Sequence, residues 1–425
     1  MRIYRYEQTN LSDLLIRTIE TSGVSGGVRD IIDDVARRGD EALLEYARRF
    51  DGAELQSLEV SREEIDRAYA NANPDLIAVL ERAAENIRAF HKAQVPEGYR
   101  LEKPDGSYMG VKVTPIEKVG LCVPGRTAAY PSTVLMTAIP AKIAGCGLLV
   151  MISPPGPDGK QPDAILAAAK IAGVDRVFRA GGAHGVAALA YGTESVPKVD
   201  KIVGPGSAFV AEAKRQVFGR VDIDMIAGPS EILVVADETA DPAHVAADLL
   251  SQAEHDELAS AVLVTDSLAL AQAVSAEVER QLSCLPREAI AKASIENNGK
   301  IIVTADLPAA VQAANELAPE HLELCVAQPE KYLDLVQNAG SVFLGRYCPE
   351  ALGDYLAGPN HTLPTCGAAR FSSPLGVEDF VKRTQYTYFT KDALEAVSGD
   401  IAIFARAEGL EAHARSALIR FGKEA

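Results

Sequence analysis

Side chains that can bind a metal ion lie close together near the end of one predicted helix. Asp241 and Pro242 are typical of a helix N-terminus, and the apolar positions after them keep helical spacing toward His255. Gln252 and His255 are three residues apart, so they would lie on one helix face and could share a divalent cation. Taken by itself, such a pair is more often part of a solvated helix surface.

An acidic partner for this pair occurs further along the chain. One amide oxygen and one imidazole form a weak Zn²⁺ site unless an anionic ligand joins them. Asp354, in the segment GDYLAGPNH, is our candidate for this third ligand, although an isolated aspartate is more often a turn residue or a helix cap. His413, in EGLEAH, could complete the site or could be a surface histidine.

Glu320 and His321 form a second candidate group, with side chains that can carry protons. They follow Pro319, which ends a predicted helix over 307–317, and precede the strand-like residues 322–326. Histidine titrates near neutral pH, and burial can raise the pKa of a glutamate toward the same range. The pair could therefore exchange protons with a substrate; the ordinary alternative is a solvated loop.

Two glycine-rich turns each lie between a predicted strand and a predicted helix: AGGAH at 180–184 and GPGS at 204–207. Such turns can bring backbone N–H groups and a helix N-terminus to a phosphate group, as a dinucleotide requires. Neither has the GxGxxG spacing, and close packing of a strand on a helix would explain the glycines equally well.

The elements that would position these side chains alternate between strand and helix. Predicted strands form two series of similar size, at 117–123, 148–153, 175–180, 200–203 and 220–225, and then at 231–236, 260–265, 299–304, 322–326 and 340–344. Helical patterns separate them, so we expect an α/β protein with parallel sheets. Residues 345–376 are rich in glycine and proline and should form a loop over a cleft.

The flanking segments have other patterns. Residues 28–90 are helical in character, with a capping box at Ser61 and Glu64. Residues 99–116 alternate around Asp105-Gly106, which predicts a hairpin, and a helical tail should start at about residue 391.

Composition narrows the possible function classes. A chain of 425 residues with 48% hydrophobic and 24% charged residues is typical of a soluble globular protein of two or three domains. Its net charge of −17 and its lack of basic runs argue against nucleic-acid or acidic-membrane partners, so a small molecule is the expected ligand. The six cysteines contain no C-x-x-C pair, and the N-terminus lacks a signal-peptide pattern, so we expect a cytoplasmic protein.

Several of these segments together resemble the motifs of the histidinol dehydrogenase family. They are SQAEH ending at His255, PEHLE starting at Pro319, GDY and NH within 353–361, and EGL followed by His413. They occur in the expected order, and the resemblance covers essentially the whole chain.

The resemblance implies an α/β fold with two incomplete Rossmann-like parallel-sheet domains, small helical N- and C-terminal extensions, and a domain-swapped homodimer. Residues 1–20 would form the N-terminal helical extension. Residues 21–121 and 231–376 would form the main domain with the catalytic and zinc residues. Residues 122–230 would bind the cofactor, and residues 377–425 would reach the partner subunit.

The resemblance also implies roles for individual residues. One Zn²⁺ per subunit would be held by Gln252, His255, Asp354 and His413, with Glu320 and His321 as catalytic bases. The substrate would be contacted by Ser230, Gln252, His255, His321, Asp354, His361, Glu408 and His413. Glu408 and His413 would come from the partner chain, and Glu408 should lie just before a helix.

The implied activity is the four-electron oxidation of L-histidinol to L-histidine through L-histidinal, with two NAD⁺, in the last steps of histidine biosynthesis. The cofactor would contact Cys122, His184 and Ser207, where family members commonly have Tyr, Gln and Asn. The preference between NAD and NADP stays open.

Two alternatives come from the same residues. One is a related NAD-dependent dehydrogenase of another small polyfunctional alcohol, such as a sulfonated diol. The other is a non-catalytic paralogue that binds a metal or metabolite, suggested by the three altered cofactor positions.

Overall fold

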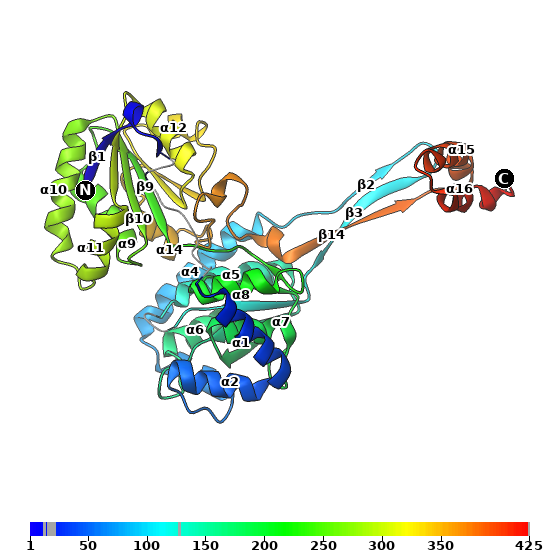
Figure 1. Cartoon of the computed structure of the whole chain (residues 1–425), viewed down its shortest axis with the longest axis horizontal. Helices are drawn as coiled ribbons and strands as arrows, with labels where there is room; N and C mark the ends of the chain where they lie inside the picture. Colours follow the sequence, from blue (N-terminus) through cyan, green and yellow to red (C-terminus); the bar gives the residue numbers. More distant parts are fainter. Residues whose placement is uncertain (12–13, 15–22, 126–128, 424–425) are drawn as a thin grey trace. The chain divides into compact units, whose positions relative to one another are not determined.

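The computed structural model describes residues 1–11, 14, 23–125 and 129–423 (Figure 1). The chain divides into two compact units. The first comprises Met1–Gln94 and Ile116–Phe380, and the second comprises Val95–Pro115 and Val381–Ala425. Within the described part of the chain, every helix is too short or too polar to cross a lipid bilayer.

The first unit contains a five-stranded parallel sheet with the order β6-β5-β4-β7-β8. Its strands are β4 (Lys118–Cys122), β5 (Leu148–Ser153), β6 (Arg176–Arg179), β7 (Lys201–Val203) and β8 (Asp222–Ile223). From β4 the chain adds β5 and β6 on one side, and it then returns to place β7 and β8 on the other side of β4. Connections on opposite faces leave a crevice at the carboxyl ends of these two neighbouring strands.

Helices from two parts of the chain cover this sheet. They are α5 (Pro131–Ala144), α6 (Asp163–Ala172), α7 (Gly182–Tyr191) and α8 (Ala208–Val217), with α1 (Ser25–Arg38), α2 (Asp40–Tyr46), the π-helical turn η3 (Ala47–Asp51), α3 (Arg62–Asn71) and α4 (Pro74–Lys92). The apolar residues of α3 and α4 share a core with α5 and α6, and those of α1 and α2 share one with α7 and α8. Residues 25–92, which we expected to belong with 231–376, therefore pack on the five-stranded sheet. An apolar helix face reveals that it will be buried but not which sheet buries it.

A second parallel sheet, of six strands, has the order β1-β11-β10-β9-β12-β13. Its strands are β1 (Arg2–Arg5), β9 (Glu231–Ala236), β10 (Ser260–Thr265), β11 (Lys300–Val303), β12 (His321–Cys325) and β13 (Ser341–Leu344). Its helices are α9 (Pro242–Ala253), α10 (Leu268–Leu282), α11 (Glu288–Asn298), α12 (Leu307–Leu317) and the short α13 (Glu330–Leu333). In Figure 1, α10 and α12 lie on opposite faces of this sheet, and each face has its own apolar core.

The N-terminus differs from the helical extension that we expected. Arg2–Arg5 is an edge strand that pairs in parallel with β11, because Ile3 and Tyr4 favour extended backbone and β11 offers a free edge. It is followed by the 3₁₀ turn η1 (Tyr6–Gln8). Residues 12–13 and 15–20 of the expected extension lie outside the described residues.

Most of 345–376 is irregular, as predicted, but it contains α14 (Glu350–Tyr355) and the 3₁₀ turn η4 (Ala368–Arg370). Asp354, expected in a loop, is therefore on a helix. A further 3₁₀ turn, η5 (Val377–Phe380), ends this unit.

The second unit combines an antiparallel sheet with a helix pair. The sheet has the order β14-β3-β2, from β2 (Tyr99–Glu102), β3 (Tyr108–Pro115) and β14 (Val381–Tyr388). The predicted hairpin joins β2 to β3, with Gly106 at φ 81° in its turn. The helices are α15 (Lys391–Ala407) and α16 (Glu411–Leu418), followed by η6 (Ile419–Phe421). The C-terminal extension is thus not purely helical, because β14 pairs with β3.

Candidate active site

The predicted site residues of the first unit all line one cavity of about 1670 Å³. They are Cys122, His184, Ser207, Ser230, Gln252, His255, Glu320, His321, Asp354 and His361. The other two, Glu408 and His413, are exposed residues of the second unit. Glu408 is the C-cap residue that follows α15, shortly before α16 begins, and His413 lies in the first turn of α16.

Helix α9 presents Gln252 to the cavity. It begins as predicted, with the Asp241 carboxylate accepting a hydrogen bond of 2.8 Å from the Ala243 N–H. We had expected His255 to lie on this helix. The helix ends at Ala253, so His255 lies in the turn that follows it. The amide of His255 donates to the Gln252 carbonyl (3.1 Å), which tightens the last turn. Both side chains nevertheless line the cavity.

Asp354 faces His361 in the same cavity. Its Oδ1 is 3.4 Å from His361 Nδ1. Burial would raise the pKa of Asp354, but the hydrogen bond to His361 and the nearby His361, His321 and His255 outweigh it and lower this pKa to about 2. Asp354 is therefore a stable carboxylate beside three imidazoles.

The donor set fits a divalent cation. Potential ligand atoms of His321, Glu350 and Asp354 all lie within 4.8 Å of one another. Gln252 is 1% exposed, and its Oε1 is buried with no hydrogen-bond partner among the described residues. A buried oxygen without a partner is costly, and coordination to a cation would satisfy it. An amide oxygen, carboxylate and imidazoles are ligands that Zn²⁺ accepts.

The backbone of β9 holds Glu320 and His321. The Glu231 N–H donates to Glu320 Oε2 (2.9 Å), and His321 Nδ1 donates to the Glu231 carbonyl (2.9 Å). Because Nδ1 carries the proton, Nε2 of the neutral ring is free to accept one. Burial lowers the pKa of His321 to about 4 and raises that of Glu320 well above its usual value. His321 is thus a neutral imidazole at pH 7.

Glu350 is a site residue that the sequence analysis missed. It is buried, and its Oε1 is 3.8 Å from His321 Nε2. Burial, reinforced by the charge of Asp354 and a hydrogen bond to it, raises the pKa of Glu350 to about 8. Glu350 and Asp354 share a face of α14 because they are four residues apart. That spacing is informative only once α14 is known to be a helix.

Comparison with known proteins identifies the family. The profile of the histidinol dehydrogenase family matches residues 16–421. The chain belongs to the histidinol dehydrogenase family. It is 54% identical over 411 residues to histidinol dehydrogenase of Geobacillus kaustophilus, covering 96% of this chain and 97% of that protein. The enzyme of Streptococcus mutans is also 54% identical, over 95% of this chain and 94% of its own.

Solved structures agree with this assignment. The crystal structure of histidinol dehydrogenase from Elizabethkingia anophelis superposes with a TM-score of 0.94 at 37% identity, and covers 99% of this chain and 98% of that one. The family-like motifs in the sequence are therefore accompanied by the family's fold along the whole chain.

The family's dinucleotide requirement directs attention to the glycine-rich turns at the cavity. Gly204 follows β7 with φ 108°, and a Cβ there would lie 2.3 Å from the Cys122 carbonyl oxygen. A buried ion pair of Lys214 and Asp224 fixes this turn: Lys214 Nζ donates to the Gly204 carbonyl (3.0 Å), and Asp224 Oδ2 accepts from the Gly204 N–H (2.7 Å). The turn thus lies rigidly against the end of β4.

The three expected cofactor contacts differ in environment. Cys122 is the last residue of β4, and burial raises the pKa of its thiol to about 12, so it is uncharged. The His184 ring lies 5.9 Å from the Phe50 ring, between centroids. Ser207 is the exposed N-cap residue of α8. At the expected cofactor positions the cavity is therefore lined by the uncharged thiol of Cys122, the rings of His184 and Phe50, and the N-terminus of α8 at Ser207.

Proposed function

We propose that this chain oxidises L-histidinol to L-histidine through L-histidinal, passing four electrons to two NAD⁺ with a bound Zn²⁺. One observation carries the proposal: in a chain of this family, Gln252, His255, Asp354, Glu320 and His321 all line a single cavity. The hydrogen bonds from the β9 backbone orient both expected bases, as general acid–base catalysis requires.

Gln252, His255 and Asp354 would hold the metal ion, with His413 of a second copy as the fourth ligand. Two observations support this assignment. Gln252 Oε1 is buried with no hydrogen-bond partner among the described residues, and the low pKa of Asp354 keeps its carboxylate ionised. The ion would act as a Lewis acid that anchors the substrate's amine and imidazole nitrogens through both oxidations. Ser230, His361 and Glu408 would orient the polar ends of the substrate.

His321 would serve the first oxidation. Its Nδ1–H is engaged by the Glu231 carbonyl, so Nε2 can take the substrate's hydroxyl proton as hydride leaves the carbon. The lowered pKa of His321, caused by burial, keeps this nitrogen unprotonated at neutral pH.

Glu320 would serve the second oxidation. One carboxylate oxygen is engaged by the Glu231 N–H, which leaves the other for a water molecule. Burial raises the pKa of Glu320 and so makes its carboxylate a stronger base. Removing a proton from that water would let it add to the aldehyde, giving a hydrate from which hydride can leave.

We further propose that the five-stranded sheet and its covering helices form a Rossmann-like domain for the dinucleotide, the hydride acceptor. This domain extends beyond the expected 122–230, because β4 and the helices of 25–92 belong to it. The strand order reverses between β4 and β7, and ligands of open parallel sheets bind at the carboxyl ends of such strands. Cys122 and the Gly204 turn occupy those ends, and Ser207 begins the helix that follows. Residues 231–376 would supply the metal and catalytic side chains.

A homodimer is the third part of the proposal. Among the described residues, the apolar core that α15 and α16 share consists of Ala402, Ala405 and Ala414, with Leu418 packed against it. Ile403 and Phe404 are 71% and 70% exposed. So small a core gives little stability, and its apolar surface is suited to burial against a second copy. Residues 377–425 would thereby carry Glu408 and His413 into the partner's site in a domain-swapped dimer.

An NADH assay tests the proposed function. Purified chain with Zn²⁺, L-histidinol and NAD⁺ should yield two NADH per histidinol; chelation should stop the reaction and added Zn²⁺ should restore it. A panel of other small alcohols, sulfonated diols included, should give far lower kcat/KM. A zinc-loaded, folded chain that forms no NADH from histidinol would overturn the proposal.

A further inference from the structure

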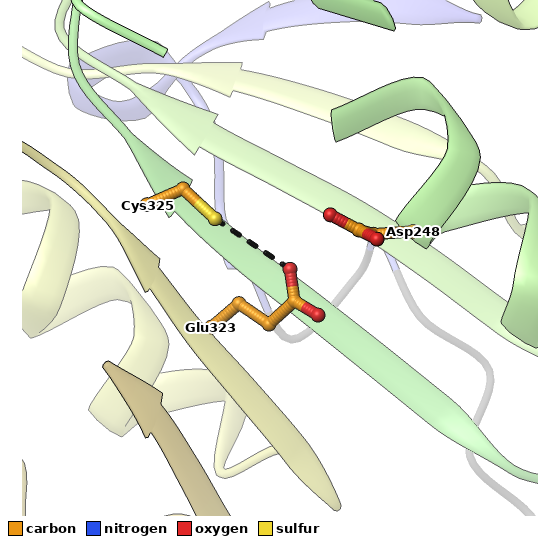
Figure 2. Close-up of side chains that lie close together, drawn as sticks. All are labelled: Asp248, Glu323 and Cys325. Atoms are coloured by element: carbon orange, nitrogen blue, oxygen red, sulfur yellow. Dashed lines mark hydrogen bonds between the residues drawn. The ribbon is translucent and has the colours of Figure 1, made fainter. Parts of the chain in front are cut away.

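A buried group of side chains lies behind the cavity, outside the catalytic set. Figure 2 shows Asp248, Glu323 and Cys325 pointing toward one another from α9 and β12. Their potential ligand atoms lie within 4.8 Å of one another. Glu323 is completely buried, Cys325 is buried, and Asp248 is partly buried.

Glu323 contacts three neighbours at once. Its Oε1 accepts a hydrogen bond of 2.7 Å from the backbone N–H of Glu350, the first residue of α14. Cys325 Sγ donates to its Oε2 at 3.6 Å (Figure 2), and one of its carboxyl oxygens lies within 4.8 Å of a carboxyl oxygen of Asp248. A single side chain of β12 is therefore hydrogen-bonded to α14 and packed against Asp248 of α9.

Each of these elements carries a proposed site residue close to its point of attachment. On β12, His321 is two residues before Glu323, so the two side chains lie on one face of the strand. On α9, Gln252 is four residues after Asp248, and on α14, Asp354 is four residues after Glu350. Such spacings place the members of each pair one helical turn apart on one face. A shift of either helix relative to β12 would therefore move a metal ligand.

The hydrogen bonds argue for a structural joint here and against a second cation site. Glu323 already accepts hydrogen bonds from the Glu350 N–H and from Cys325, and burial raises the pKa values of Asp248, Glu323 and Cys325. Raised pKa values disfavour the anionic forms that metal ions need.

We propose that Glu323 is a positioning residue that joins α9 and α14 to β12 and so sets the separations among Gln252, Asp354 and His321. Its effect on metal binding rests on the proposed function. Its effect on α14 does not.

Two substitutions separate the hydrogen bonds of Glu323 from its bulk. Glu323→Gln keeps an oxygen for the Glu350 N–H and an N–H for Asp248, as a protonated glutamate would. Glu323→Leu is of similar size but offers no hydrogen-bonding group to the Glu350 N–H or to Asp248. Asn315→Ala is the matched control, because the buried Asn315 amide also ties a loop to a helix: it donates to the Leu335 carbonyl (2.8 Å) and accepts from the Gln337 N–H (2.7 Å). This control lies on α12 and does not line the cavity.

The variants are compared, as full chains, by Zn²⁺ affinity and by hydrogen–deuterium exchange. Zn²⁺ affinity, measured by competition with a chelating dye, should fall roughly 10–100-fold in Glu323→Leu, the usual range for losing a group that orients metal ligands. It should stay within about threefold in Glu323→Gln and in Asn315→Ala. Hydrogen–deuterium exchange of the metal-free chain should accelerate in α14 for Glu323→Leu alone. If that variant does not fold, Asp248→Ala cuts the joint at α9 and should weaken Zn²⁺ binding by a similar factor.

The outcomes separate this proposal from the proposed function. Unchanged α14 exchange in a folded Glu323→Leu chain overturns the positioning role, and so does a Glu323→Gln chain as impaired as Glu323→Leu. An unsubstituted chain that binds no Zn²⁺ contradicts the metal site, while exchange at α14 still decides whether Glu323 positions that helix.

Discussion

The two parallel sheets of the first unit meet the same cavity with opposite ends. The five-stranded sheet contributes carboxyl ends: Cys122 finishes β4, and the Gly204 turn follows β7. The six-stranded sheet contributes amino ends: Ser230 precedes β9, and His321 is the first residue of β12. Both sheets reverse their strand order at a central pair, β4 with β7 and β9 with β12.

The difference lies in what occupies the carboxyl ends of the six-stranded sheet. Ala327, after β12, donates its N–H to Asp237 Oδ2 after β9 (2.8 Å), and Arg346 donates to the Thr239 carbonyl (2.6 Å). These bonds link the loops where a ligand would otherwise enter. The same topology thus places a glycine-rich backbone edge of one sheet and an edge of ionisable side chains of the other at the cavity. Substitutions at the two edges should therefore have different effects on catalysis and on cofactor binding.

The largest expected effect is at the amino-end edge. His321→Asn removes the imidazole that would accept the hydroxyl proton, and should lower the rate of the first oxidation roughly 10²–10⁴-fold. Single-turnover NADH formation from histidinol measures it. NADH formation from supplied histidinal should be much less affected, and equal loss in both half-reactions would contradict the role assigned to His321.

Glu320→Gln should give the reverse pattern. An amide cannot take a proton from water, so oxidation of supplied histidinal should fall roughly 10²-fold or more while the first hydride transfer continues. The rate of the first turnover from histidinol is the internal control. A variant that loses the first step as completely as the second would show that the two bases do not divide the work.

At the carboxyl-end edge, Lys214→Met should act through stability and cofactor binding. It leaves Asp224 buried without its cation, and breaking a buried ion pair from one side costs about 3–5 kcal/mol. Urea unfolding should show this loss. In the folded fraction, KM for NAD⁺ should rise while Zn²⁺ affinity stays unchanged; weaker Zn²⁺ binding would mean that the two edges are not separable.

Protonation of Glu350 should make the stability of the metal-free chain depend on pH. Burial raises the pKa of Glu350 from 4.5 to about 8, so the folded chain holds a proton that the unfolded chain releases. This contribution is complete below pH 4.5 and is lost as the pH rises to about 8, by at most about 1.4 kcal/mol per pH unit. Glu350→Gln should flatten this part of the profile in urea unfolding at pH 5 to 9. Parallel profiles for the two chains would contradict the raised pKa.

The regular elements were predictable because local signals fix them. Strands β9 and β10 and helix α12 match the predicted ranges, since apolar runs between turn residues leave few alternatives. Strand β14 was missed because its sequence, VKRTQYTY, is polar and exposed on both faces. Helix α14 was missed because it contains Gly353, follows Pro349 and is attached by Glu323, far away in sequence.

The candidate ligands and bases could be named from the sequence, but the buried acidic residues that contact or position them could not. Nothing in the sequence around Glu350, Glu323 and Asp248 distinguishes them from acidic residues of a protein surface. Only the fold reveals that Glu350 and Glu323 are buried. Burial alters their pKa values and turns them into hydrogen-bonding joints. Such properties depend on long-range packing, which residue spacing does not encode.

The smallest expected effect is at Ser207, where family members commonly carry Asn. Ser207 caps α8 without a side-chain capping bond among the described residues, and it is exposed at the cavity. Ser207→Asn would add an amide that can reach the cofactor, and one neutral hydrogen bond contributes about 1 kcal/mol, or roughly fivefold in affinity. KM for NAD⁺ should therefore fall by about that factor with kcat unchanged. Ser267→Asn is the matched control, since Ser267 caps α10 away from the cavity. An equal change in both variants would trace the effect to helix capping and leave Ser207 without a part in cofactor binding.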